Sequence, residues 1–93
     1  MAKASFPYKV TNNMDKYVRL KQAELVEERG EKVTLTEVYD IIGQACGVTG
    51  FTVSMLKSGS YNPSIILAFL LAQYFGTTVD ELFGIVPEET KEG

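Results

Sequence analysis

Residues 38–63, VYDIIGQACGVTGFTVSMLKSGSYNP, are the stretch that decides the fold of this 93-residue chain. A first amphipathic run ends at Cys46, and a three-residue corner, Gly-Val-Thr at 47–49, follows it. A second run covers residues 50–58 and stops at Gly59. Two short helices joined by a tight corner that contains glycine form a helix-turn-helix. The stretch therefore predicts this motif, with the rest of the chain packed around it.

The first helix of the motif has the clearest start signal in the chain. Thr34 is followed three residues later by Glu37, which is the spacing of a capping box. Val33 before the cap and Val38 after it have the spacing of a hydrophobic staple. These residues predict a helix over 35–46.

Side-chain periodicity assigns inner and outer faces to the two helices of the motif. We expect the first helix to bury Val38, Ile42 and Ala45, and to approach its neighbour closely at Gly43, where glycine costs about 1 kcal/mol relative to alanine. Thr49 is positioned to cap the second helix, with Val53 and Leu56 pointing inward. The outward residues of the second helix are then Gly50, Phe51, Ser54, Met55 and Lys57.

Three further helices are expected around the motif. One starts at Asn12 or Asn13 as the cap and runs to Arg29, where Gly30 ends it. Another starts at Asn62 as the cap, with Pro63 in the first helical position. It runs to Gly76 and is apolar nearly all round, so it forms the central core or is covered by a partner. A short fifth helix spans residues 78–84. The pattern thus predicts an all-α, compact five-helix bundle.

Composition excludes several classes of protein. The chain is 45% hydrophobic and 23% charged, and its longest apolar run, residues 65–72, is too short to cross a membrane. The first residues lack an apolar signal segment, which favours a cytoplasmic protein. With one cysteine and no histidine, a Cys/His metal site and histidine-dependent catalysis are excluded. We therefore expect no enzyme, no cofactor, no metal and no small-molecule ligand domain, and we expect Cys46 to be buried.

The charges are unevenly distributed although the net charge is only −3. Residues 1–21 carry five basic residues against one acidic residue, and residues 87–93 carry three acidic residues against one lysine. We divide the chain into an N-terminal arm (1–12), a helix-turn-helix domain (13–86) and an acidic disordered tail (87–93). The arm is either a disordered terminus, with FPYKV as a short strand or extended lead, or a segment that reaches DNA phosphates through Lys3 and Lys9.

The sequence GVTGFTVSMLKSGSYNPSIILAFLLAQYFGTTVDELF, at residues 47–83, resembles the Cro/C1-type (XRE-type) helix-turn-helix domain. The resemblance extends over about residues 13–84 and rests on an ordered set of signals rather than on one motif. It implies a lambda-repressor-like five-helix fold, binding to double-stranded DNA, frequent homodimers on palindromic sites, and gene control in bacteria or phages. The signals are Gly47-Val48-Thr49, Val53-Ser54, Gly59, Asn62-Pro63-Ser64 and Thr78-Val79-Asp80-Glu81-Leu82-Phe83.

The resemblance also implies roles for individual positions. The base-reading positions correspond to Thr49, Gly50, Phe51, Ser54 and Met55. The phosphate contacts correspond to Tyr39, Lys57, Ser58, Ser60, Tyr61 and Asn62. The chain departs from the family pattern at Tyr39, where a glutamine is common, and at Gly43, where an alanine is common.

The predicted outer face of residues 50–58 is poor in arginine, asparagine and glutamine, which make the bidentate contacts worth about 1–3 kcal/mol of discrimination. Modest base specificity and a shallow salt dependence are therefore expected. Asp40 near this face would repel phosphates unless it points away or pairs with a lysine.

A phage- or mobile-element-type repressor that binds DNA as a dimer is the function that the residues favour. A helix-turn-helix-fold protein-interaction module, such as an antitoxin or anti-repressor, is the alternative, with Phe51 and Met55 as an apolar contact patch. The residues proposed for dimerisation are equally suited to the core: Phe69, Tyr74, Phe83, Ile85 and Val86.

Overall fold

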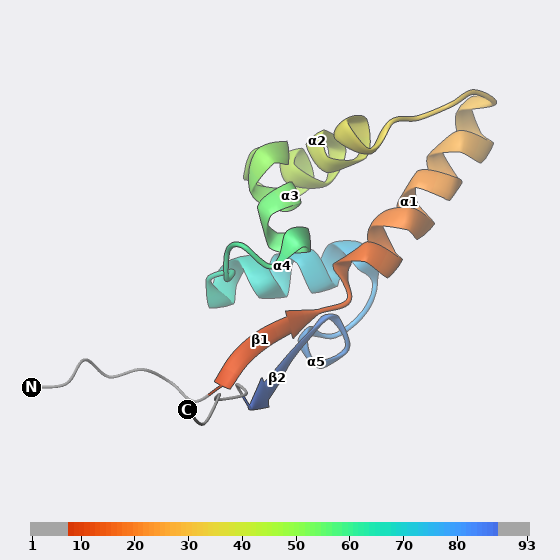
Figure 1. Cartoon of the computed structure of the whole chain (residues 1–93). Coiled ribbons are helices and arrows are strands. Elements are labelled where there is room, and N and C mark those ends of the chain that lie inside the picture. The colour runs from red at the N-terminus through yellow and green to blue at the C-terminus, as the bar shows by residue number, and fades with distance from the viewer. Residues whose placement is uncertain (1–7, 88–93) are drawn as a thin grey trace, which may run out of the picture.

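The computed structural model describes residues 8–87 (Figure 1). The arm residues 1–7, including Lys3, and the tail residues 88–93 lie outside the described part. The elements follow in the order β1 (Tyr8–Asn12), α1 (Met14–Arg29), α2 (Leu35–Cys46), α3 (Gly50–Ser58), α4 (Ile65–Phe75), α5 (Val79–Leu82) and β2 (Phe83–Pro87).

The predicted five helices are confirmed and the fold is mostly helical, but it is not purely all-α, because β1 and β2 form a two-stranded antiparallel sheet. The register pairs Val10 with Ile85 and Asn12 with Phe83. β-branched residues on both strands favour this extended pairing. The fifth helix is correspondingly shorter than expected, since the backbone is already extended at Phe83 and Gly84 lies inside β2.

The start signals of α2 and α3 act as the sequence predicts. The backbone N–H of Glu37 donates to Thr34 Oγ1 at 3.2 Å, and the backbone N–H of Thr34 donates to Glu37 Oε1 at 3.0 Å, which completes the capping box. In α3 the backbone N–H of Thr52 donates to Thr49 Oγ1 at 3.1 Å. Both helices of the motif therefore begin where local sequence places them.

The caps of α1 and α4 could not be assigned correctly from the sequence. Two candidates were left for the cap of α1, and the wrong residue was predicted for the cap of α4. At α1 the side chain of Asn12, rather than Asn13, accepts from the backbone N–H of Met14 at 2.9 Å. At α4 the expected cap at Asn62 is wrong, because Ser64 is the cap and its Oγ accepts from the N–H of Leu67 at 3.1 Å. Pro63 therefore precedes the helix instead of opening it.

One hydrophobic core holds the helices together. Within it Gly43 and Cys46 are buried, whereas Ala45, expected to be buried, faces solvent. Burial raises the pKa of the Cys46 thiol, as expected for a cysteine that packs as a small apolar residue. The buried hydrophobic side chains of this cluster are Met14, Val18, Leu25, Val33, Val38, Ile42, Cys46, Val53, Leu56, Leu67, Leu71, Ala72 and Leu82.

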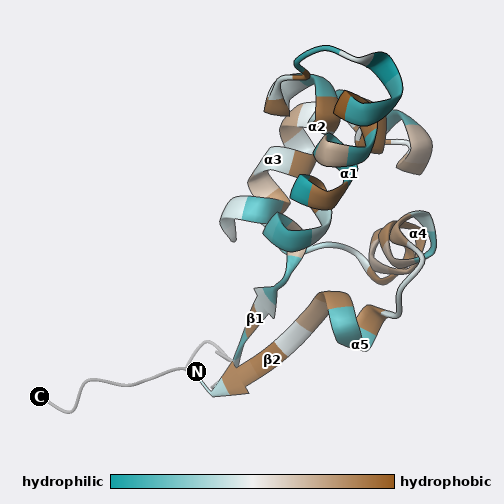
Figure 2. Ribbon diagram, turned by 90° about the vertical axis from the view of Figure 1, so that its right-hand side faces the viewer, coloured by the Kyte–Doolittle hydropathy of each residue, from teal (hydrophilic) through white to brown (hydrophobic). Residues whose placement is uncertain are grey.

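The outer face of α4 stays apolar without being covered. Leu67 and Leu71 are buried, but Ile65, Ile66 and Phe69 on the same helix are exposed. Figure 2 shows α4 coloured hydrophobic along nearly its whole length, and most of β2 shares that colour.

The motif and the sheet occupy different ends of the molecule. In Figure 1 helices α2 and α3 form the upper part, α4 lies beneath α3, and the sheet lies at the lower end. The backbone N–H of Asn13 donates to the Leu82 carbonyl at 2.8 Å, and Asn12 Nδ2 donates to the Leu56 carbonyl at 3.0 Å. The first bond joins the end of β1 to α5, and the second fixes the sheet end to the last turn of α3. Among residues 8–87, no helix is long and apolar enough to span a bilayer.

Candidate nucleic-acid interface

The corner between α2 and α3 depends on a close backbone contact at Gly43. A Cβ placed there would stand 2.5 Å from the carbonyl oxygen of Val48 and 2.9 Å from the carbonyl carbon of Thr49. Both atoms belong to backbone, which cannot move aside as a flexible side chain can. Gly43 thus allows the two helices to meet at short range, as its place in the sequence predicts.

Helix α3 presents one buried face and one accessible face. Val53 is fully buried and Leu56 nearly so, whereas the Phe51 side chain is 73% exposed. Ser54 and Met55 are half-buried. The residues expected to face outward therefore do so to different degrees, and the ring of Phe51 projects farthest into solvent.

The first residues of α3 are engaged locally. The hydroxyl of Thr49 accepts the capping hydrogen bond, and its Oγ1 lies 3.1 Å from Thr52 Oγ1. Gly50, half-buried, packs against α2 next to Asp40. Thr49 therefore serves the helix start, and its exposed side chain remains on the same surface as Phe51.

Two of the predicted phosphate-contact residues already have partners within the domain. Tyr39 is half-buried and packs against the core. Lys57 Nζ lies 3.3 Å from Asp15 Oδ1, and Asp15 also pairs with Arg19 at 3.2 Å. The hydrogen bond from Lys57, together with Arg19, lowers the pKa of the Asp15 carboxyl. The carboxylate thus holds the last turn of α3 against the first turn of α1 through Lys57.

The remaining predicted phosphate contacts lie in the loop after α3. The hydroxyl of Ser58 donates to the Met55 carbonyl at 3.0 Å and lies 2.9 Å from the hydroxyl of Ser60. Ser60, Tyr61 and Asn62 are exposed. This loop presents hydroxyl and amide groups of the kind that contact phosphate oxygens.

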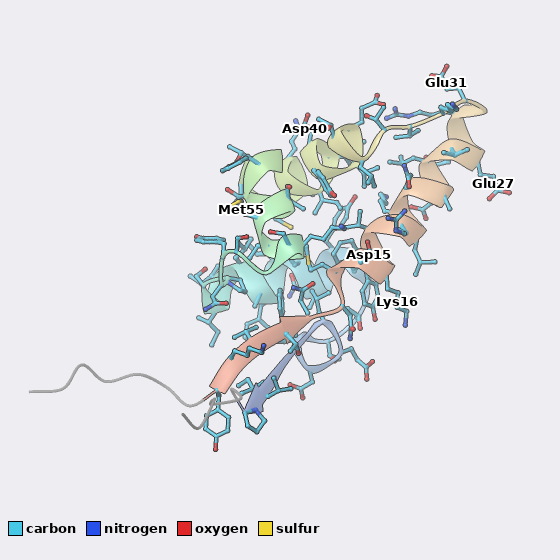
Figure 3. All side chains as sticks on the ribbon, in the orientation of Figure 1. Asp15, Lys16, Glu27, Glu31, Asp40 and Met55 are labelled. Atoms are coloured by element: carbon cyan, nitrogen blue, oxygen red, sulfur yellow. The ribbon has the colours of Figure 1, made fainter. Side chains whose placement is uncertain are left out.

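Two basic residues of α1, Lys16 and Lys21, are engaged with aromatic rings of the domain. Lys16 Nζ stacks 5.3 Å from the Tyr17 ring centroid. Lys21 Nζ lies 5.2 Å from the Tyr74 ring centroid and 2.9 Å from Glu24 Oε1, and the hydrogen bond that Lys21 donates to Glu24 raises the Lys21 pKa. In Figure 3 Lys16 projects from the right side of the molecule and Met55 from the left.

A hollow of about 280 Å³ opens between α2 and α3. Asp40, for which the sequence predicts no role, belongs to its wall. The sequence does contain a signal for this site, an acidic residue in α2 and a glycine at the start of α3. Only the folded structure shows that these two residues lie side by side. The lining residues are Thr36, Tyr39, Asp40, Gly50, Phe51 and Ser54.

The surface around this hollow is weakly acidic. Residues 35–64 carry three charges, Glu37, Asp40 and Lys57, and the single cation is the one paired with Asp15. Affinity for a polyanion would therefore come from N–H groups, hydroxyls and shape more than from free cations. The arrangement suits recognition and contains no cluster of groups for catalysis within residues 8–87.

Two curated proteins are similar to this chain. An uncharacterized helix-turn-helix-type transcriptional regulator of Methanocaldococcus jannaschii is 33% identical over 42 residues, which cover 45% of this chain and 64% of that protein. An uncharacterized helix-turn-helix-type transcriptional regulator of Archaeoglobus fulgidus is 30% identical over 67 residues, which cover 72% of this chain and 92% of that protein. No family model matches the chain. No solved structure matches it.

Proposed function

The chain belongs to the helix-turn-helix-type transcriptional regulators, and we propose that it is a sequence-specific repressor of the Cro/C1 (XRE) type, such as phages and mobile elements carry. In this proposal α3 enters the DNA major groove, and Thr49, Gly50, Phe51, Ser54 and Met55 meet base edges. The loop after α3, together with Tyr39 and Lys57, contacts the phosphates on either side.

The observation that carries the proposal is the accessible face of α3. Phe51 and Ser54 lie on the side of α3 away from the buried Val53 and Leu56, and no other element described in residues 8–87 seals that side. A capped helix whose N-terminal turn is open to solvent has the form in which recognition helices read DNA.

Recognition by this face would rely on hydroxyl and apolar contacts. Ser54 and Thr49 can contact several base edges, and Phe51 can pack against a thymine methyl. These contacts discriminate less than arginine–guanine or glutamine–adenine pairs, so the shape of the groove would contribute a larger share of specificity.

We further propose that the regulator binds as a homodimer through the uncovered face of α4 and β2. Ile65 is 73% exposed and Ile85 71% exposed, and Ile85 lines a hollow together with Pro63, Val10 and Phe83. Contiguous exposed apolar surface of this kind marks interaction sites.

The charge pattern favours a second copy as the partner on this face. Residues 58–79 contain no charged side chain. A two-fold axis places the same patch of each subunit opposite itself, so the uncharged stretch 58–79 avoids like-charge repulsion, and the charged residues that line the neighbouring hollows, Lys9 and Asp80, have opposite signs. The sheet end lies away from α2 in Figure 1, so a dimer formed there leaves the α2–α3 hollow with Phe51 open, while Asn62 lies at the border of the two surfaces.

The test is DNA binding by full-length variants of the α3 face. Phe51→Glu and Ser54→Glu each place a carboxylate against the groove, and we expect either change to abolish a gel shift of the DNA upstream of the chain's own gene. Ala23→Glu, at an exposed position on α1, adds the same charge elsewhere and should leave the shift intact. Unchanged binding by both α3 variants would remove α3 from the DNA contact.

A protein-interaction module, such as an antitoxin or anti-repressor, is the second candidate function. The observation in its favour is the pairing of the single cation of residues 35–64 with Asp15, next to an exposed phenylalanine. If the wild-type protein shifts no duplex from a random-sequence pool at low salt, this second function replaces the first.

A further inference from the structure

Asp40 stands where α2 and α3 come closest on the candidate DNA surface. A Cβ on Gly50 would overlap the Asp40 carboxylate and stand 3.0 Å from the Asp40 backbone nitrogen. Glycine at the first position of α3 therefore leaves room for the carboxylate beside the helix start. In Figure 3 Asp40 projects from the upper part of the molecule, on the α2 side of the corner.

The Asp40 carboxylate differs from the acidic side chains of its neighbourhood. Asp15 is paired with Lys57 and Arg19, and Glu37 is held by the Thr34 cap. Asp40 makes no side-chain hydrogen bond or ion pair with any residue in the range 8–87, and it is exposed. The carboxylate therefore has unused acceptor capacity, although its Oδ1 packs against Gly50.

The rest of the hollow supplies complementary chemistry. Its wall carries the hydroxyls of Thr36, Tyr39 and Ser54 and the ring of Phe51, and it contains no cation. A group that donates a hydrogen bond, or a methyl group, suits such a wall. A group that offers only acceptors would face the carboxylate with no cation in the wall to offset the repulsion.

We infer that this hollow is a base-reading subsite, in which Asp40 accepts a hydrogen bond from the exocyclic amino group of cytosine or adenine while Phe51 packs beside it. The inference rests on the proposed DNA binding. In the major groove cytosine presents its N4 amino group and adenine its N6 amino group, whereas guanine presents the acceptors O6 and N7. Asp40 thus selects an amino-bearing base at one position of the contacted strand and excludes guanine there.

Two other roles for Asp40 make different predictions. A carboxylate near the N-terminus of α3 can stabilise the helix dipole, and its removal would then change stability but not sequence preference. A carboxylate that only faces phosphates weakens all binding, so its removal would raise affinity for every sequence equally. Only a base-reading role predicts that removal of the Asp40 carboxylate changes the base preference at one position of the DNA site.

The experiment is selection of binding sites from a random duplex pool with the full chain, followed by titration of the selected site and of each single base-pair change. We expect wild type to favour cytosine or adenine at one position, by about five- to 150-fold over guanine. Asp40→Ala should lose that preference and keep the preferences at all other positions. Asp40→Asn is isosteric and gains an N–H donor, so it should admit guanine at that position.

Asp15→Asn serves as the matched control, because it removes one negative charge beside α3 outside the hollow. It should change overall affinity without changing any base preference. Urea unfolding of each variant separates loss of fold from loss of recognition. A uniform gain of affinity in Asp40→Ala, with the wild-type preferences retained, would overturn the inference while leaving the proposed function intact. Selection of no duplex by wild type would overturn the proposed function itself.

Discussion

At the scale of single residues, two glycines set the geometry of the corner. Gly43 allows α2 to meet the backbone of the turn, and Gly50 leaves room for Asp40 beside the start of α3. Neither position has a positive φ, so the requirement is for space rather than for left-handed backbone. The motif thus depends on the absence of a methyl group at two places.

Gly43→Ala tests this dependence because two effects oppose each other. Helix propensity alone predicts stabilisation of about 1 kcal/mol. The added Cβ would press on the Val48 and Thr49 backbone, and overpacking costs about 1–3 kcal/mol. We expect net destabilisation, measured as a lower urea midpoint with an unchanged slope.

Ala45→Gly is the matched control, since Ala45 is exposed in the same helix. It should lose about 1 kcal/mol through propensity alone. A Gly43→Ala protein that is more stable than wild type would contradict the close contact at the corner.

At the scale of elements, α2 begins with a capping box in which Thr34 and Glu37 bond each other, and the Glu37 carboxyl of this box can titrate. Hydrogen bonds from the Thr34 backbone and hydroxyl lower the pKa of the Glu37 carboxyl, and Arg29 acts in the same direction. A lowered folded-state pKa means that the ionised carboxylate stabilises the fold. This contribution is complete above the ordinary glutamate pKa and is lost as the pH falls through the folded-state value.

Thr34→Ala and Glu37→Gln separate the cap from its charge. Thr34→Ala should cost about 1 kcal/mol at neutral pH, because a cap hydrogen bond is lost. Glu37→Gln keeps an acceptor for the capping box but cannot titrate. Urea unfolding at neutral pH and below the ordinary glutamate pKa of about 4.3 should show a smaller acid loss for Glu37→Gln than for wild type. Equal acid losses would show that the cap is insensitive to ionisation.

At the scale of the whole molecule, the apolar α4–β2 face remains exposed to solvent in the monomer. Its most exposed members are Ile65, Ile66 and Ile85, with Phe69 beside them on α4. A stable interface of ordinary size needs about 800 Å² from each partner. α4 and the sheet together offer a continuous apolar surface on which such an interface can form.

Ile65→Lys and Phe69→Lys place like charges opposite each other in the proposed dimer. We expect each change to weaken self-association by about tenfold or more, because central apolar contacts carry much of an interface's free energy. Sedimentation equilibrium over a concentration series measures this directly. Leu20→Lys, at an exposed apolar position on α1, should not change it. A wild-type chain that remains monomeric throughout the series would exclude the dimer.

Local signals were enough to predict much of the helix-turn-helix. The Thr34 and Thr49 caps and the spacing of Val38, Ile42, Val53 and Leu56 act within a few residues, so the sequence alone indicates them. Chain neighbours do not reveal the α4 cap, however, because Asn62 and Ser64 are both good caps and packing chose between them.

The sequence by itself therefore determined the helices, the caps of α2 and α3 and most of the inward faces of these two helices, because these depend on short-range hydrogen bonds and periodicity. Only the tertiary structure decided that Tyr8–Asn12 pairs with Phe83–Pro87, that Lys57 is held by Asp15, and that Asp40 meets Gly50. Each of these joins two elements, and in the sheet the paired residues are 71 to 79 positions apart. Contacts of that kind produce no periodic pattern in the sequence, because their partners lie on different elements and are brought together only by the tertiary fold.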